Sequence, residues 1–161
     1  MKIAVVVPGR FHAFNLVRAL RARGHDVVLF TNYPKWAVRR FGIAPSSTRS
    51  FWIPGVVSRL FGWFAGTVGT PYPEPLLHPW FGRWALGILR KTRWDMLYVW
   101  SGVAEEIALA PEPIGVVRFL MRGSSHIRTQ ARILEEEKTR VGIPADHPTR
   151  IEIFLDRRDR L

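Results

Sequence analysis

The sequence predicts an α/β fold: a Rossmann-like open, mostly parallel sheet with helices on both faces, in a single domain over residues 1–161. Three observations near the start predict it. The apolar, β-branched run Ile3–Val7 suits a strand that is buried on both faces. Residues Phe11–Arg23 place apolar side chains at helical spacing opposite arginines, and Asp26–Phe30 resembles the first strand. Strand, helix and strand within about 30 residues make one βαβ unit.

The alternation continues along the rest of the chain, which favours a parallel sheet. Gly24 suits the position just after the first helix, where glycine is favoured. Residues 55–70 are an apolar stretch interrupted by glycines, and the prolines of residues 70–79 predict a loop. The further predicted helices are residues 34–40, 80–93, 103–110, 125–140 and 148–161, and the further predicted strands are 48–53, 96–100 and 116–121.

Composition narrows the class of protein. A chain of 161 residues with 47% hydrophobic and 23% charged residues is long and apolar enough to fold around one core. It contains no cysteine, which excludes disulfides, iron–sulfur clusters and cysteine-ligated zinc, and fits a reducing cytoplasm. The first apolar run is too short for an export signal, and Pro54 and Arg59 make residues 51–70 a poor membrane-spanning helix.

The net charge of +11 is concentrated in the first part of the chain. Residues 1–100 hold 14 Lys and Arg against 3 Asp and Glu, whereas residues 101–161 hold 10 of each kind. Such an asymmetry favours a basic face for an anionic partner, such as lipid headgroups, a phosphorylated substrate or nucleic acid. The alternative is a solvated, arginine-rich surface without a partner.

Three loops follow strands of the predicted sheet and should meet at its carboxyl edge, where open parallel sheets bind ligands. They are residues 8–12, 100–102 and 122–126. The first loop has only Gly9 where a dinucleotide site needs G-x-G-x-x-G, and Asn32 ends the second strand where a ribose-binding acid is expected. No stretch supplies a P-loop. NAD binding and ATP or GTP hydrolysis are therefore disfavoured.

Two histidines lie in these loops and suit proton transfer or donation to an oxygen ligand. The alternatives are a plain turn residue for His12 and a helix cap for His126. Backbone amides near Arg122 and Ser125 could hold an anionic group at a helix N-terminus. The histidines show no metal-ligand spacing, and no G-x-S-x-G elbow supports a catalytic triad. We expect no metal.

Aromatic residues gather in the middle of the chain, where residues 51–100 hold 12 of the 20. They alternate with basic residues, as at a lipid interface. One alternative is that they belong to the core; another, single-stranded nucleic acid, has no supporting motif and is disfavoured. The residues expected at a membrane surface are Arg59, Trp63, Phe64, Arg83 and Trp84.

Two stretches carry a resemblance to a known family. The opening VVVPGRFHAFNLVRALRARGHDVVLFTNYP and the later RFLMRGSSHIRTQARILEEEKTRVGIP look like the N-terminal domain of GT-B glycosyltransferases of the retaining "group 1", or family 4-like, type. The likeness covers most of residues 1–145. Many Rossmann-like folds share the first stretch, and the second is more distinctive. The chain departs from the family in lacking the C-terminal domain, and IEIFLDRRDRL stands where members carry an acidic stretch.

The resemblance implies a half-site. In such enzymes the N-terminal domain binds the acceptor, and the C-terminal domain binds most of the nucleotide-sugar donor, so no cofactor is expected in this chain. His126 matches a histidine near the transferring sugar and is the expected catalytic residue. The residues expected to bind the acceptor or phosphate are Gly9, Arg10, His12, Ser101, Arg122, Gly123, Ser124 and Ser125.

We therefore expect the acceptor-binding half of a glycosyltransferase that acts on a glycan or lipid-linked acceptor in cell-envelope polysaccharide synthesis. It should be inactive alone and completed by a partner protein that carries the C-terminal domain. We expect it in the cytoplasm, peripheral to the inner membrane. The alternative is a non-catalytic α/β module or truncated remnant that binds an anionic membrane or partner.

Overall fold

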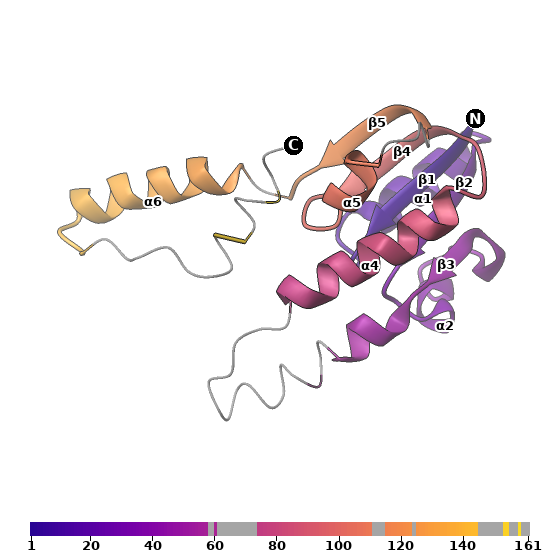
Figure 1. Cartoon of the computed structure of the whole chain (residues 1–161), viewed down its shortest axis with the longest axis horizontal. Coiled ribbons are helices and arrows are strands. Elements are labelled where there is room, and N and C mark those ends of the chain that lie inside the picture. Colours follow the sequence, from indigo (N-terminus) through magenta and orange to yellow (C-terminus); the bar gives the residue numbers. More distant parts are fainter. Residues whose placement is uncertain are drawn as a thin grey trace.

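The computed structural model describes residues 1–57, 60, 74–110, 115–123, 125–144, 153, 154 and 158. Five strands form one sheet in the order β3-β2-β1-β4-β5, and every pair is parallel (Figure 1). This confirms the predicted α/β fold with an open parallel sheet. The strands are β1 (Lys2–Val7), β2 (Asp26–Thr31), β3 (Thr48–Ser50), β4 (Trp94–Trp100) and β5 (Gly115–Met121).

Helices lie on both faces of this sheet. The labelled helices are α1 (Ala13–Ala22), α2 (Lys35–Arg39), α4 (Glu74–Leu89), α5 (Glu105–Ala108) and α6 (Ile127–Arg140), of which α6 does not cover the sheet; a 3-10 turn lies at Pro45–Ser47. Residues 52–57 are also helical. The first helix ends as predicted, since Gly24 has a φ of 82°, a left-handed conformation that glycine adopts without strain.

Two hydrophobic clusters, one on each face, hold the layers together. On the face that α1 covers, Phe14 and Val17 pack with Val5 and Leu29 of the sheet. On the opposite face, α4 and α5 pack over Val6, Phe30 and Leu97. Because neighbouring residues of a strand point to opposite faces, alternate residues of β1 belong to one cluster and the residues between them to the other. We refer to these as the α1 face and the α4 face.

The predicted loop at residues 70–79 is wrong over residues 74–79, because α4 begins at Glu74, and residues 70–73 lie outside the described residues. Pro75 lies in the first turn of the helix, where a missing N–H costs nothing, and Pro79 is accommodated inside it. Apolar side chains spaced for one helix face decide the outcome: Leu77, Phe81 and Leu89 are all buried.

Two other elements also differ from the expectation. The third strand spans only Thr48–Ser50 rather than residues 48–53, and helical residues begin at 52. The predicted final helix at 148–161 falls almost wholly outside the described residues. The helix α6 begins after His126, close to the predicted start, but it lies apart from the sheet and buries none of its residues (Figure 1).

Candidate functional site

An open cavity lies beyond the carboxyl ends of β1, β2 and β3, the edge at which parallel sheets bind ligands. Its volume is about 800 Å³. The segments that follow three different strands enclose it, together with the helical residues 52–57. The lining residues are Pro8, Gly9, Asn32, Tyr33, Pro34, Lys35, Trp36, Ser50, Trp52, Gly55 and Val56.

Hydrogen bonds fix the strand ends that form the cavity. Thr31 Oγ1 donates to the carbonyl of Gly9 at 3.0 Å, and Asn32 Nδ2 donates to the carbonyl of Pro8 at 3.1 Å. Ser50 Oγ donates to the carbonyl of Tyr33 at 2.6 Å. These side-chain bonds connect the first loop to the second and the second to the third, so the wall is preorganised.

Asn32 is fixed at the cavity wall by its side-chain amide. Its Nδ2 is oriented by the Pro8 carbonyl, which places Oδ1 on the other side of the amide group. That Oδ1 is buried and accepts no hydrogen bond from the described residues. A buried acceptor without a partner costs about 1–3 kcal/mol. Gly55 packs against this residue, since a Cβ there would lie 3.0 Å from the Asn32 carbonyl oxygen.

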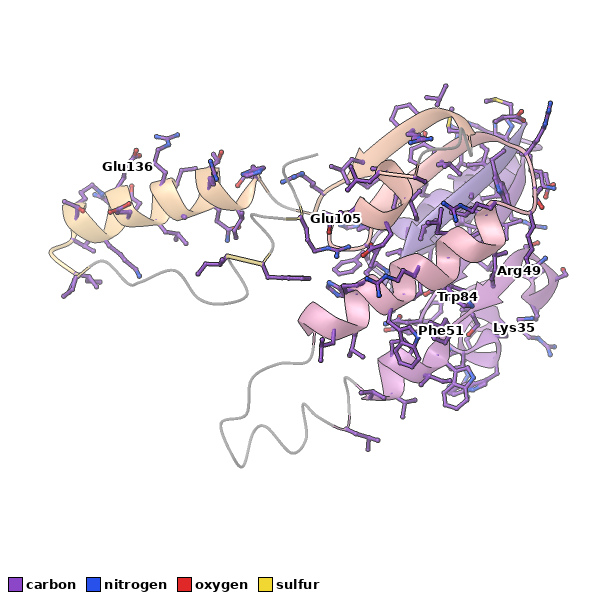
Figure 2. All side chains as sticks on the ribbon, in the orientation of Figure 1. Lys35, Arg49, Phe51, Trp84, Glu105 and Glu136 are labelled. Atoms are coloured by element: carbon purple, nitrogen blue, oxygen red, sulfur yellow. The ribbon has the colours of Figure 1, made fainter. Side chains whose placement is uncertain are left out.

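Aromatic rings and one cation complete the lining. Trp36 and Trp52 remain 63% and 51% exposed, which is unusual for such large apolar side chains. Arg40 lies over the Trp36 ring at 5.1 Å and holds it in place. Lys35 is exposed at the start of α2 (Figure 2). The cavity therefore combines flat apolar faces with a positive charge.

Of the three site residues predicted in the first loop, Gly9 lines this cavity, and Arg10 and His12 do not. The Phe11 ring explains the need for glycine, because a Cβ on Gly9 would lie 2.9 Å from that ring. Phe11 itself has a φ of 37°, a strained value for a residue with a side chain. Arg10 stacks over Phe41 at 4.7 Å. His12 is exposed and precedes α1 without capping it through its side chain.

The other two predicted loops lie side by side near β4 and β5. The Ser101 amide donates to the carbonyl of Met121 at 2.9 Å, which joins them. His126 caps α6: its Nδ1 accepts a hydrogen bond from the amide of Arg128 at 3.2 Å. Helix capping was one of the two roles expected for this histidine. The catalytic role stays a prediction, and none of these residues lines the cavity.

The remaining members of the predicted phosphate-binding loop have different surroundings. Arg122 is half-buried, Gly123 and Ser125 are exposed, and Ser124 lies outside the described residues. Their role in binding phosphate stays a prediction.

The residues expected at a membrane surface are only partly described. Arg59, Trp63 and Phe64 lie outside the described residues, and Arg83 is exposed. Trp84 is half-buried and stacks on Phe51, with ring centres 5.1 Å apart and planes 18° apart (Figure 2). This packing is what the core alternative expects. Among the described residues, no helix has the length and apolarity needed to cross a membrane.

A second polar cluster lies on the α4 face, where α5 begins. Arg158 is only 5% exposed and binds both oxygens of Glu106, at 3.0 and 2.5 Å, and Glu105 at 2.9 Å. Burial, with a further contribution from the positive charge of Arg158, lowers the pKa of His78 to about 4, against the opposing effect of Glu106. His78 is therefore neutral at pH 7.

Glycines let these groups approach one another. Glu106 packs against the bare backbone of Gly82 in α4, where any Cβ would collide with its carboxylate. Gly102 has a φ of 87°, and a Cβ there would lie 3.0 Å from Nδ1 of His78. The cluster thus joins α4, α5 and Arg158.

Sequence reasoning missed most of the cavity. Lys35, Trp36 and Ser50 carry no sequence prediction, Trp52 is noted only among the aromatic residues of the middle of the chain, and Asn32 is considered only as evidence against NAD. The signal was present, because TNYPKW and SFW directly follow or end the second and third strands. The rule that parallel strands place their carboxyl ends at one edge would have found them.

The described residues contain no group of three or more side chains that could hold a metal ion.

Comparisons with known proteins identify no family for this chain. No protein-family model, curated protein or solved structure matches the chain.

Proposed function

We propose that this chain is the acceptor-binding half of a glycosyltransferase and that its acceptor is a saccharide carrying a phosphate. The single observation that carries the proposal is the cavity at the ends of β1, β2 and β3, with its combination of tryptophans, Asn32 and Lys35. The resemblance of residues 1–145 to GT-B acceptor domains agrees with it.

The lining suits a sugar ring. Sugars present an apolar face of C–H groups and a rim of hydroxyls, and exposed tryptophan faces such as those of Trp36 and Trp52 bind the former.

The charge suits a phosphate. Lys35 is exposed in the lining, and the excess of 14 basic over 3 acidic residues in positions 1–100 attracts an anion to this half of the protein. A lysine is a flexible point charge and accepts a phosphate in several geometries. A hexose phosphate or a sugar-phosphate headgroup of a lipid would therefore satisfy both parts of the cavity.

In the proposed reaction an acceptor hydroxyl attacks the anomeric carbon of a nucleotide-bound sugar. The new glycosidic bond forms, the bond to the nucleoside diphosphate breaks, and the acceptor proton leaves to a base. The proposal assigns donor binding to a second domain outside these 161 residues. This chain contributes acceptor orientation, and His126 and the residues around it contribute to the donor side.

Binding is tested with the full chain and the fluorescence of its own tryptophans, using glucose 1-phosphate, glucose and inorganic phosphate as separate probes. We expect Lys35→Ala to weaken glucose 1-phosphate binding about threefold to tenfold and to leave glucose binding unchanged. Arg39→Ala is the matched control, since Arg39 is an exposed cation in the same helix that does not line the cavity. Equal effects of the two variants, or no binding of either sugar, would contradict the acceptor site.

Transfer is tested separately with UDP- or GDP-sugar donors. We expect no transfer by the chain alone and transfer when a C-terminal-domain protein is added. Efficient transfer by the chain alone would refute the half-site assignment without touching the acceptor site.

The alternative class, a non-catalytic module on an anionic membrane, is tested by flotation with vesicles of phosphatidylglycerol at low and high salt. Salt-sensitive flotation without any sugar binding would favour this alternative over the acceptor site.

A further inference from the structure

A fully buried hydroxyl lies at the carboxyl end of β2, next to residues that line the cavity. It belongs to Thr31, the last residue of the strand, whereas threonine side chains are mostly exposed in folded proteins. In the part of the chain that the structure describes, the other buried polar or charged residues are Thr48 and Arg158. Burial of a hydroxyl is costly unless it is hydrogen-bonded, so the partners of Thr31 indicate its role.

The Thr31 hydroxyl joins the loop after β1 to the loop after β2. Its Oγ1 accepts a hydrogen bond from the Tyr33 amide at 3.2 Å and donates one to the carbonyl of Gly9 at 3.0 Å. This assignment of the proton is settled, because an amide N–H can only donate and a carbonyl can only accept. Gly9 and Tyr33 both line the cavity, and Thr31 does not. The hydroxyl therefore fixes the position of one wall relative to the other without contacting a ligand.

The backbone of Thr31 reaches the third segment of the cavity. Its carbonyl oxygen accepts a hydrogen bond from the Phe51 amide at 2.9 Å. Phe51 lies between Ser50 and Trp52, which both line the cavity. Because β2 is the middle strand of the three whose ends form the cavity, this one residue contacts all three segments. Two of its contacts depend on the hydroxyl, and the third depends only on the backbone.

The loop after β1 has a strained backbone that needs to be held. Phe11 has a φ of 37°, and its ring packs so closely on Gly9 that a Cβ there would lie 2.9 Å from it. Such a conformation persists only where surrounding contacts hold it. Side-chain hydrogen bonds from Thr31 to Gly9 and from Asn32 to Pro8 hold this loop against the end of β2. Without the hydroxyl, the loop would relax and Gly9 would leave its place in the wall.

We propose that Thr31 is a positioning residue of the acceptor site, whose hydroxyl sets the distance between the walls after β1 and β2 and thereby the affinity of the cavity for its ligand. The inference rests on the proposed function, since it takes the cavity as the acceptor site. Thr31 acts through Gly9 and Tyr33. A cavity whose walls already stand in the bound geometry binds more tightly, because no loss of loop freedom then opposes binding.

The test compares three neutral substitutions. Thr31→Val replaces the hydroxyl with a methyl group and removes both of its hydrogen bonds, whereas Thr31→Ser keeps the hydroxyl. Thr48→Val is the matched control, because Thr48 is equally buried in the neighbouring strand β3 and its Oγ1 donates to the Ala44 carbonyl at 3.1 Å. Neither Thr48 nor Ala44 lines the cavity. Circular dichroism checks that each variant is folded under the conditions of the assay.

Binding of glucose 1-phosphate, followed by tryptophan fluorescence, gives the first readout. We expect Thr31→Val to weaken binding about tenfold, and Thr31→Ser and Thr48→Val to stay within about twofold of the unsubstituted protein. Unchanged binding by Thr31→Val, or an equal loss in Thr48→Val, would overturn this inference and leave the proposed function standing. No binding by the unsubstituted protein would overturn the proposed function and this inference with it.

Amide hydrogen exchange gives a second readout that needs no ligand. The Tyr33 amide donates to the Thr31 hydroxyl, whereas the Phe51 amide donates to the backbone carbonyl of Thr31. In Thr31→Val we expect the Tyr33 amide to exchange at least tenfold faster and the Phe51 amide to keep its rate; Thr31→Ser should restore slow exchange at Tyr33. Unchanged exchange at Tyr33 would overturn the inference. Equal acceleration at both amides would also overturn it, because the hydroxyl would then support the whole strand end rather than the loops.

Discussion

Acidification should destabilise this protein through one histidine, His78. In the unfolded chain this side chain takes up a proton near pH 6.5, but in the folded protein burial and Arg158 lower its pKa to about 4. Between these values the unfolded state binds more protons, so the free energy of unfolding falls as the pH falls. Above pH 6.5 His78 is neutral in both states and does not lower the free energy of unfolding. As the pH falls from 6.5 toward 4, the proton taken up by the unfolded state lowers that free energy.

The size of the effect follows from the two pKa values. The difference between 6.5 and about 4 corresponds to about 3 kcal/mol, at 1.36 kcal/mol for each pH unit. That is a large share of the 5–15 kcal/mol by which domains of this kind are stable. The loss should therefore be visible in equilibrium unfolding.

The assay is urea unfolding, followed by tryptophan fluorescence, of the unsubstituted protein and of His78→Gln at intervals from pH 7 to pH 4. Glutamine is neutral throughout and cannot gain the proton. Carboxylates titrate in both proteins, so their effect cancels when the two unfolding free energies are subtracted. We expect that difference to fall by up to about 3 kcal/mol between pH 7 and pH 4. A difference that stays constant over this range would refute the reasoning.

Two further predictions concern the same cluster. Arg158→Leu should raise the pKa of His78 because it removes a positive charge, whereas Glu106→Gln should lower that pKa further because it removes a negative charge. A proton NMR titration of the His78 imidazole measures both shifts. If the two variants moved the pKa in the same direction, the assigned contacts would be contradicted. Gly82→Ala should destabilise the protein by about 1–3 kcal/mol because its Cβ collides with Glu106. Gly87→Ala in the same helix meets nothing within 4 Å and should stabilise it by up to about 1 kcal/mol; thermal unfolding compares them, and equal effects would argue against the collision.

Local patterns predicted the core of the fold well. The apolar run before Pro8, the amphipathic segment that ends at Gly24 and the following apolar run gave the first βαβ unit within two residues of its observed bounds. These patterns were sufficient because a strand that is buried on both faces requires a continuous run of apolar residues, and a helix that is buried on one face requires apolar residues at helical spacing. The start of α4 was missed because prolines predict a loop, while the burial of Leu77 and Phe81 outweighs that preference.

The candidate site depended on residues that are far apart in the sequence. Nothing local distinguishes Asn32 in TNYP or Ser50 in RSFW as a ligand contact. They become one cavity wall only because the pairing of β1, β2 and β3 places Gly9, Asn32 and Ser50 at the same edge, where side-chain hydrogen bonds join them. The rule that ligands bind beyond the carboxyl ends of parallel strands indicates the edge of the sheet. The order of the strands in the sheet decides which residues become neighbours at that edge.

The sequence by itself determined the fold class and indicated the carboxyl edge of the sheet, where the cavity lies, because both depend on apolar spacing and on the direction of parallel strands. Only the tertiary structure decided which residues meet there. It also decided that Trp84 packs against Phe51, that His78 is half-buried near Arg158, and that α6 buries none of its residues. These outcomes depend on contacts between distant segments, and the energy of such contacts is not encoded in the pattern of any one segment.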